Sequence, residues 1–373
     1  MAGGELGRRL LGRPGDLADL DRRQLSQQDP WHAGNLLGAA DPGAALRQWQ
    51  QQGALVEDGK PSYYLLEVVG AGGVPARFLL CGLTADERIH ELEEGLERPA
   101  RTPLEPVLAV AADDHQVLRK LLAEAAQQKP PDWETHSEGR QIRLWRMAAS
   151  PLWSRMQEHL AEVQVRPLAP ISTDAPCLAA ILPLSDPGLS VLPVHRGLRN
   201  VDTFQPERFL TVVAGYARIY DLEVSLEVPQ GLAAASERLA SLANGYHAVL
   251  LALPGGRGKI LRFRQGLDLS HLRAAPRNPT LRALDLALLN ALVFRTVLGI
   301  SEPEAVGHPH IFPVGSLDRL VAQVGQGVFQ AGFALNPPPL WELRAVIEAD
   351  QKLPPHTMVV EPAPPAGLLF MAP

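Results

Sequence analysis

The stretch Asp186–Arg196 reads DPGLSVLPVHR, and it decides how the second half of the chain is arranged. A Pro-Gly turn dipeptide leads into four residues of apolar-polar alternation, a pattern typical of a strand. Because proline has no N–H to donate to a strand ladder, we expect the strand to end at Pro193. His195 and Arg196 then follow the end of the strand, so an imidazole and a guanidinium lie side by side at the rim of a sheet. Ligand-binding groups tend to gather at such rims.

The composition is typical of a soluble globular protein. The chain has 373 residues, 46% of them hydrophobic and 20% charged, which excludes a mostly disordered chain and allows two domains. With a net charge of −6, the whole surface has no electrostatic attraction to a phosphate backbone, so no nucleic-acid partner is expected. Two cysteines without a C-x-x-C pair indicate a reducing compartment, and we expect a cytoplasmic protein. Neither a signal peptide nor a membrane-spanning run is expected, so no membrane partner is predicted.

Strand and helix patterns alternate along most of the chain. Residues 1–30 are polar and rich in turn residues, which predicts a flexible N-terminal arm. Residues 31–373 predict an α/β fold with mixed sheets flanked by helices, in approximate lobes 31–200 and 201–373. The run Leu281–Leu298 is apolar nearly all round, which predicts a buried helix in the core of the C-terminal half.

Several segments together resemble one bacterial and archaeal family, known as domain of unknown function 1015. Four segments carry the resemblance, in the family's order: DPGLSVLPVHR, LDLALLNALVFRTVLGI (Leu284–Ile300), FALNPPPLWELRAV (Phe333–Val346) and LPPHTMVVEPAPPAGLLF (Leu353–Phe370). His90 and Glu91 are a weaker match, at the place of a histidine-glutamate pair in the family. The similarity extends over roughly residues 30–373.

The departures from the family concern groups that would hold phosphate. The family shows an A-D-G-H-H-R motif and a helix before the strand that precedes D-P-G-L, whereas this chain has VRPLAPISTDAPC at 165–177. His356 and Ala363 occupy two positions near the end where the family has lysine. The missing motif resembles the phosphate-binding element of the ParB and sulfiredoxin group, which includes nucleotide-dependent free-serine kinases. In that element, backbone N–H groups at a helix start would hold a polyphosphate, so here the element is expected to be degenerate.

The ligand-binding candidates come from what remains of these motifs. His195 and Arg196 are candidates for binding an anion or a carboxylate. The alternative is structural: Arg196 pairs with a carboxylate such as Asp186, and His195 simply ends a strand. His90 and Glu91 are further candidates, although their charged stretch also fits a solvated helix face. The remaining candidates, taken from the family's C-terminal segment, are His356 and Thr357.

Two histidines, His308 and His310 in GHPHIF, lie two positions apart on a segment that reads as extended. Side chains with this spacing would face one side. Since no carboxylate or cysteine is near in the sequence, no metal site is predicted there.

The sequence leads to three functional hypotheses. The first is a non-catalytic or weakly active protein that binds a small anionic metabolite or a nucleotide, derived from a phosphate-handling ancestor. The second is a nucleotide-dependent phosphotransferase acting on a small hydroxylated metabolite such as free serine, with substitute residues at the site. The third is a structural or partner-binding subunit. Catalytic residues, cofactor and oligomeric state are not defined by the sequence.

Overall fold

A computed structural model describes most of the chain. The described residues are 10–12, 41–52, 56–57, 62–70, 72–85, 89–94, 106–137, 139–147, 150–171, 177–267, 272, 275–365 and 367–371. The predicted N-terminal arm, residues 1–30, lies outside them except for Leu10–Gly12.

The chain divides into two compact units. Unit 1 contains the described residues up to Leu92, those from Pro106 to Ser190 and those after Glu361. Unit 2 contains Val191–Glu361 together with the short segment that begins at Glu93. The C-terminal end therefore belongs to unit 1, and each unit is built from stretches that are distant in the sequence.

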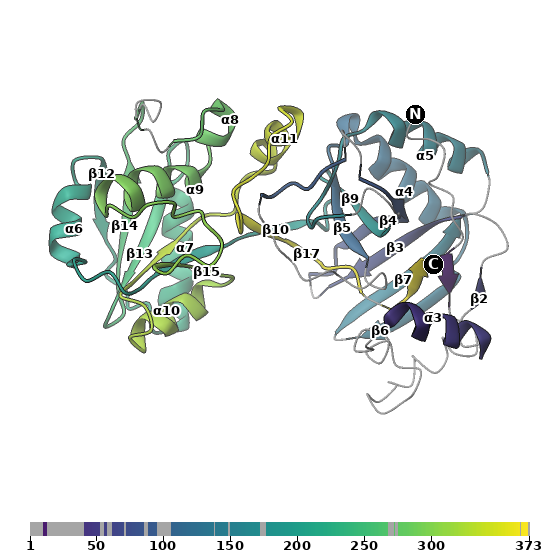
Figure 1. Ribbon diagram of the computed structural model, residues 1–373, viewed down its shortest axis with the longest axis horizontal. Helices are drawn as coiled ribbons and strands as arrows, with labels where there is room; N and C mark the ends of the chain where they lie inside the picture. Colours follow the sequence, from purple (N-terminus) through teal and green to yellow (C-terminus); the bar gives the residue numbers. More distant parts are fainter. Residues whose placement is uncertain are drawn as a thin grey trace. The chain divides into compact units, whose positions relative to one another are not determined.

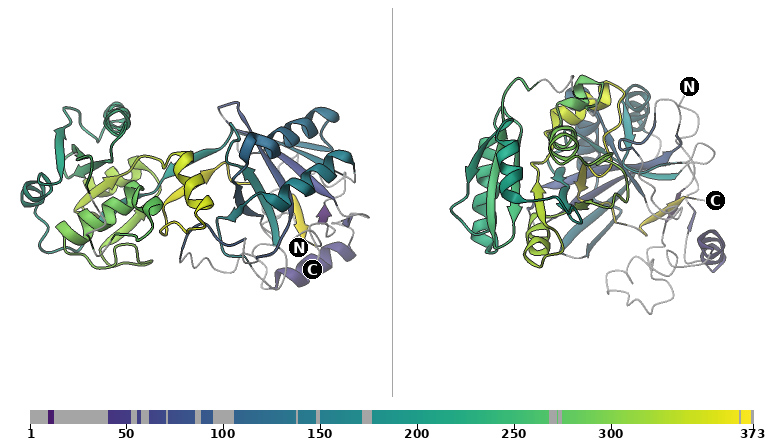
Figure 2. Two further views of the ribbon diagram at one scale, coloured as in Figure 1. Left: turned by 90° about the horizontal axis from the view of Figure 1, so that it is seen from above. Right: turned by 60° about the vertical axis from the view of Figure 1, so that its left-hand side comes forward.

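Unit 1 is an α/β unit around a seven-stranded mixed sheet (Figure 1). In the order β6-β7-β3-β4-β9-β5-β8 only β5 and β9 are parallel neighbours. Helices α4 and α5 pack on one face of this sheet, as Figure 2 (left) shows. The elements of the sheet and its helices are β3 (Tyr63–Val69), β4 (Pro75–Leu83), β5 (Val107–Ala111), η1 (Asp114–Gln116), α4 (Val117–Gln128), β6 (Trp133–Ser137), β7 (Arg140–Met147), α5 (Pro151–Glu162), β8 (Val165–Pro167) and β9 (Cys177–Pro183). The remaining elements are α3 (Pro42–Gln51) and the small antiparallel sheet of β18 (Leu369–Met371), β1 (Leu10–Gly12) and β2 (Val56–Glu57).

A row of alternating charges crosses four strands of this sheet. Arg77 on β4 lies opposite Glu67 on β3, Glu67 opposite Arg143 on β7, and Arg143 opposite Glu134 on β6. Glu67 is buried, and its two carboxylate oxygens accept hydrogen bonds from Arg77 Nε (2.8 Å) and Arg143 Nη1 (3.0 Å). A slip of one residue would turn these side chains to the opposite face, so the row favours this register over its neighbours.

Unit 2 has three layers, with helices on both faces of a six-stranded antiparallel sheet (Figures 1 and 2). The strand order is β12-β14-β13-β16-β11-β15. One face packs against α6, α9 and η3, and the other against α7 and α10. The strands and helices of unit 2 are β10 (Ser190–Pro193, beginning at the last residue of unit 1), β11 (His195–Leu198), α6 (Pro206–Val213), β12 (Ala217–Asp221), α7 (Pro229–Leu242), β13 (Ala248–Leu253), β14 (Arg257–Phe263), α8 (Pro279–Arg282), α9 (Asp285–Leu288), η3 (Leu289–Val297), β15 (Ile311–Val314), α10 (Leu317–Gly325), β16 (Ala331–Ala334), α11 (Leu340–Glu348) and β17 (Met358–Glu361), which pairs with β10.

These layers confirm the predicted α/β class, with mixed sheet and flanking helices. The predicted buried helix over Leu281–Leu298 is interrupted, and its buried residues lie between Leu284 and Phe294. Leu284 has extended backbone angles (φ −75°, ψ 136°), so a new helix begins at Asp285. Beyond Leu288 the helix widens into a π-helix, in which Leu298 N–H donates to Val293 five residues earlier. Sustained π-helix is rare and occurs often near functional sites.

The stretch DPGLSVLPVHR also differs from the prediction in one detail. Strand β10 ends at Pro193, as expected, but the chain starts β11 at His195. Strand β11 lies between β16 and β15, so His195 and Arg196 are part of the sheet and not beyond its rim. Pro193 ends the pairing of β10, and after one further residue the chain begins to pair in the six-stranded sheet as β11.

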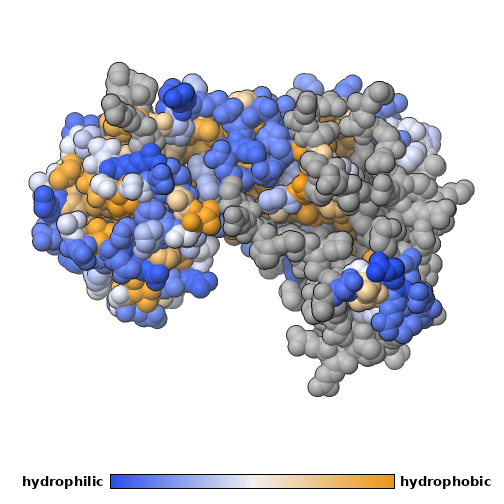
Figure 3. Space-filling model, viewed as in Figure 1, coloured by the Kyte–Doolittle hydropathy of each residue, from blue (hydrophilic) through white to orange (hydrophobic). Residues whose placement is uncertain are grey.

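The surface mixes polar and apolar residues. On the face of unit 2 that Figure 3 displays, hydrophobic residues are interspersed with hydrophilic ones. In the described part of the chain, none of the helices has both the length and the apolar character needed to span a bilayer.

The charge row predicts a specific loss of stability. We expect Glu67→Gln to lower the free energy of unfolding by about 2–3 kcal/mol, because two guanidinium groups lose their charged, buried partner. The measurement is urea denaturation followed by circular dichroism. As a control, Glu124→Gln removes a carboxylate from the exposed pair with Arg155 and should cost no more than about 1 kcal/mol. Equal effects of the two substitutions would contradict the role given to Glu67.

Candidate functional site

Arg196 is buried at 4% exposure, and its guanidinium is used inside the protein. Nη1 donates to the carbonyl oxygens of Val194 (2.9 Å) and His195 (3.2 Å). Nη2 donates to those of Pro355 (3.2 Å) and His356 (3.0 Å). Burial lowers the pKa of Arg196 to about 10, an effect that the charge of Glu93 opposes, and the group is charged at neutral pH. Arg196 therefore fixes the Pro355-His356 backbone onto the start of β11.

Glu93 binds the backbone N–H groups of the same segment. Its Oε2 accepts a hydrogen bond from His356 N (3.1 Å), and its Oε1 accepts one from Met358 N (3.2 Å). The carboxylate is buried at 5% exposure. A backbone bridge between Glu93 and Leu353 adds to this attachment. The loop Leu353–Met358 is thus held by a guanidinium on its carbonyls and by a carboxylate on its amides.

His195 fixes a second segment of unit 2. Its Nδ1 accepts a hydrogen bond from the Leu335 N–H (3.2 Å), directly after the end of β16. Burial, with the charge of Arg196 as a smaller cause, lowers the pKa of His195 to about 4. The ring is therefore neutral at physiological pH, as an acceptor at Nδ1 requires.

The other predicted site residues are divided between the two units. Asp186 belongs to unit 1, where Oδ1 accepts from Gly188 N (2.8 Å) and Oδ2 from Arg77 N (3.4 Å). Burial raises the pKa of Asp186. His90 and Glu91 also belong to unit 1, and His90 Nδ1 lies 3.3 Å from the Glu91 carbonyl oxygen. The carboxylate whose charge acts on Arg196 is Glu93, where the sequence had suggested Asp186.

His356 and Thr357 lie in the loop that Arg196 and Glu93 hold. His356 has a positive φ of 54°, a left-handed conformation that is uncommon outside glycine. Thr357 Oγ1 donates to Pro354 O (2.7 Å). His195, Arg196 and the His356-Thr357 pair are thus brought together in unit 2.

His308 and His310 form a local hydrogen-bonded turn. His308 Nδ1 accepts from the backbone N–H groups of His310 (3.0 Å) and Ile311 (3.2 Å), so this nitrogen is already used. The two rings lie 5.6 Å apart. In the part of the chain that the structure describes, no three His, Cys, Asp or Glu side chains are grouped so that they could hold a metal ion.

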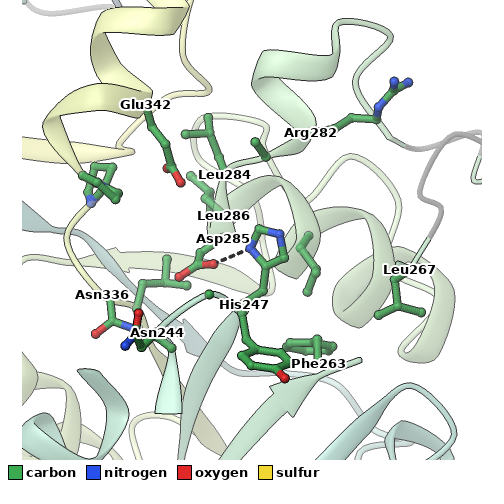
Figure 4. Close-up of a pocket in the computed structure, with 18 of the residues that line it drawn as sticks. Asn244, His247, Phe263, Leu267, Arg282, Leu284, Asp285, Leu286, Asn336 and Glu342 are labelled. Atoms are coloured by element: carbon green, nitrogen blue, oxygen red, sulfur yellow. Dashed lines mark hydrogen bonds and ion pairs between the residues drawn. The ribbon is translucent and has the colours of Figure 1, made fainter. Parts of the chain in front are cut away.

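A cavity of about 750 Å³ lies in unit 2, within the size range of small-molecule sites. Its walls come from the end of α7, the starts of β13, α9 and α11, and the segment after β16. The residues that carry its chemistry are Asn244, His247, Asp285, Asn336 and Glu342, all labelled in Figure 4, together with Trp341. Thr357 is the one residue of the predicted set that lines it.

His247 and Asp285 form a hydrogen-bonded pair in this cavity. Gly245, with a φ of 72°, turns the chain after α7 and brings His247 to the start of β13. Asp285 opens α9, where a carboxylate is favoured by the helix dipole. His247 Nδ1 lies 2.7 Å from Asp285 Oδ1, and this hydrogen bond raises the pKa of His247, against the opposing effect of burial. With Nδ1 as donor, Nε2 is the acceptor that can take a proton from a bound molecule.

Glu342 is a second carboxyl in the same cavity, on the first turn of α11. Figure 4 shows it extending from that helix toward Asp285 and His247. Burial is the largest cause, and the negative charge of Asp285 the next, of a pKa of Glu342 raised to about 7. Near neutral pH the cavity therefore holds a carboxylate, an imidazole and a carboxyl that changes its protonation state. Such a set is typical of sites that bind or transfer protons.

Basic groups contribute little to the interior of this cavity. Besides His247, the basic residues in its lining are Arg264 and Arg282. Arg264 Nη2 donates to Ala214 O and Arg282 Nη1 to Arg277 O. In Figure 4, the Arg282 side chain extends away from the His247–Asp285 pair. The centre of the cavity is therefore acidic.

His195 and Arg196 act on this cavity through its walls. Neither residue lines it, but His195 holds Leu335, next to Asn336, and Arg196 holds His356, next to Thr357. The sequence reasoning missed His247, Asp285 and Glu342. The sequence signal for these residues was their position, since each lies at or next to the start of a strand or helix. Polar residues are also common at such positions for structural reasons alone, so the signal was not specific.

Comparisons with known proteins give fold likenesses of low similarity. No protein-family model matches the chain, and no curated protein sequence matches it. One similar solved structure is a conserved hypothetical protein from Pyrococcus furiosus, with 11% identity and a TM-score of 0.35, covering 79% of this chain and 95% of that one. Two others are a free serine kinase in complex with AMP (10% identity, TM-score 0.34) and a mutant of it in complex with ADP (10%, 0.35), each covering 79% of this chain and 92% of that one. No function follows for this chain from likenesses of this degree.

Replacement of Arg196 tests its structural role. We expect Arg196→Lys to lower the free energy of unfolding by at least about 3 kcal/mol, because one ammonium cannot serve carbonyls on two segments. Guanidinium chloride denaturation measures the loss. The control is Arg344→Lys in the exposed i,i+4 pair with Glu348, where a change of about 0.5 kcal/mol or less is expected. If Arg196→Lys were as mild as this control, the guanidinium would not be holding the loop.

The raised pKa of Glu342 predicts how stability depends on pH. A carboxyl whose pKa is higher in the folded than in the unfolded state stabilises the fold at low pH. This contribution is complete below the unfolded pKa, about 4.5, and is lost as the pH rises through about 7. The raised pKa of His247 acts in the same direction. We expect the unfolding free energy of Glu342→Gln to fall less than that of the wild type from about pH 5 to pH 8.

The measurement is denaturant unfolding at several pH values at constant ionic strength. Glu348→Gln, on the exposed part of the same helix, should leave the pH profile unchanged. A wild-type profile that Glu342→Gln does not flatten would show that this carboxyl does not titrate in the window.

Proposed function

We propose that this protein binds a small polar metabolite in the cavity of unit 2 and has little or no catalytic activity. The observation that carries the proposal is the convergence of His247, Asp285 and Glu342 in a cavity of about 750 Å³. Fixed polar groups on a partly apolar wall are the usual composition of a small-molecule site. The groups are presented by the starts of β13, α9 and α11, and rigid elements hold a site more precisely than loops do.

We further propose that the chain is a divergent member of the family known as domain of unknown function 1015. The positions of the resembling segments support this. Leu284–Ile300 supplies Asp285, Phe333–Val346 supplies Asn336 and Glu342, and the C-terminal segment supplies Thr357. Three of the four segments thus contribute to one cavity, and the fourth holds its walls through His195 and Arg196.

The lack of phosphate-binding groups favours binding over phosphoryl transfer. The D-G-H-H-R motif is missing from the sequence, and His356 and Ala363 stand at the positions of the family's lysines. In the described lining of the cavity, the two arginines donate to backbone carbonyls. Phosphoryl transfer requires neutralisation of the phosphate charge, and this cavity offers few groups for it.

The two free cysteines, Cys81 and Cys177, support a cytoplasmic setting.

The His247–Asp285 pair supports one second candidate, a phosphotransferase acting on a small hydroxylated metabolite. An imidazole oriented by a carboxylate can remove the proton of an attacking hydroxyl. In that case a nucleotide would supply the phosphoryl group. The sequence hypothesis of free serine as acceptor falls in this class.

One experiment distinguishes these functions. The purified protein is screened against small polar metabolites by thermal shift, and each hit is followed by calorimetric titration. We expect ligands that raise the melting temperature, as any molecule that binds only the folded state does. His247→Gln should weaken their binding about tenfold or more, the effect of losing a hydrogen bond to a charged group. The exposed His136→Gln is the matched control.

The same protein is then incubated with magnesium, ATP or ADP, and serine. A phosphorylated product that is lost in His247→Gln would establish the phosphotransferase and overturn the non-catalytic proposal. If no metabolite bound at millimolar concentration, or if His247→Gln left all binding intact, the cavity would not be the functional site.

A further inference from the structure

The cavity of unit 2 offers an incoming molecule more negative than positive charge. Asp285 and Glu342 reach it from α9 and α11, and the His247 ring is hydrogen-bonded to Asp285 beside them. The groups that act electrostatically on Glu342 are Asp285, which disfavours its ionisation, and His247, which favours it. A positive ligand would remove the repulsion between the two carboxylates and compensate for their burial.

Amide groups and an apolar wall extend the site beyond these charges. Asn336 Nδ2 is buried and has no hydrogen-bond partner in the described structure, although its residue lines the cavity. Figure 4 places Asn336 and Asn244 close together on one side. The apolar side chains Leu267, Leu284, Leu286 and Leu335 line the same space. A single ammonium ion would leave most of this wall uncovered, so the ligand must also have an apolar body.

Trp341 lies next to Glu342 in the sequence and lines the cavity while remaining 65% exposed. A large aromatic side chain this exposed gives up much of the burial that usually stabilises it. Its ring offers a face on which an aromatic or cationic group can pack, because the ring face is electrostatically negative.

From this arrangement we infer that the ligand is an organic cation, an amine whose ammonium group pairs with Glu342 and whose apolar or aromatic body lies along Leu335 and Trp341. The inference rests on the proposed function, since it specifies what the same cavity binds. Asn336 Nδ2 is then available to an acceptor atom of the ligand, such as a carbonyl or hydroxyl oxygen.

Binding of an amine changes the protonation of the site. The ligand enters as an ammonium ion, Glu342 gives its proton to the buffer, and the carboxylate then pairs with the ammonium. No bond other than this O–H bond is broken. Near neutral pH, proton release should therefore accompany binding and should disappear when Glu342 cannot ionise.

Three probes that share a phenylethyl body test the charge preference: 2-phenylethylamine, 2-phenylethanol and 3-phenylpropanoate. Each is titrated into the full-length protein by calorimetry at about pH 6.5, in two buffers that differ in ionisation enthalpy. We expect the amine to bind at least about tenfold more tightly than the alcohol, and the carboxylate to bind most weakly. The heat of amine binding should differ between the buffers, which reports proton release.

Variants separate the contributions of charge and apolar body. Glu342→Gln should weaken the amine about tenfold, leave the alcohol nearly unchanged and abolish the dependence on buffer. Trp341→Ala should weaken phenylethylamine more than ethylamine. Glu348→Gln, exposed on the same helix, should change neither. Thermal melts confirm that each variant is folded.

Several results would overturn the inference: tighter binding of 3-phenylpropanoate, equal binding of all three probes, or no binding of the amine at about 10 mM. If the metabolite screen still yielded a ligand that requires His247, the proposed function would stand and only the assignment of an amine would fail. If neither the probes nor the screen showed binding, both would fail.

Discussion

The buried guanidinium of Arg196 is the interaction on which the arrangement of unit 2 depends most. It donates to four backbone carbonyl oxygens, two at the start of β11 and two in the loop after Leu353. Glu93 completes the attachment by accepting from two amides of that loop. Burial of either charge alone would cost several kcal/mol, whereas here each has hydrogen-bond partners and the opposite charge acts on it. The Leu353–Met358 loop, which has little regular structure of its own, is fixed in this way.

Hydrogen bonds of this kind also position part of the cavity wall. His195 and Arg196 are adjacent in sequence and point to different segments, one to Leu335 and the other to Pro355 and His356. The residues that follow these segments, Asn336 and Thr357, belong to the cavity wall. His195 and Arg196, which resemble a ligand-binding motif in the sequence, therefore position the cavity wall without lining the cavity. The hydrogen bonds of His195 and Arg196 fix backbone segments, and the polar groups that line the cavity belong to other residues.

Within the cavity, the physical constraint is the proximity of two carboxyl groups. Asp285 is engaged by His247, and Glu342 lies where burial and the charge of Asp285 both oppose its ionisation. Ionisation of Glu342 near neutral pH therefore destabilises the folded protein, and a positively charged ligand would reduce the repulsion between the two carboxylates. The same charges disfavour an anionic ligand in this cavity.

The sequence alone determined much of the local structure. Apolar periodicity and turn residues predicted the α/β class, the end of β10 at Pro193 and a buried C-terminal-half helix, because these depend on neighbours within a few residues. Only the tertiary structure decided where the candidate site lies. His247, Asp285 and Glu342 are separated by 38 or more residues and meet because three elements begin at one place in unit 2. The role of His195 and Arg196 was equally out of reach of the sequence, since the carbonyls that Arg196 holds in the C-terminal loop lie about 160 residues further along the chain. The residue type determines which hydrogen bonds and ion pairs a side chain can form, and the tertiary structure determines which partners lie within reach.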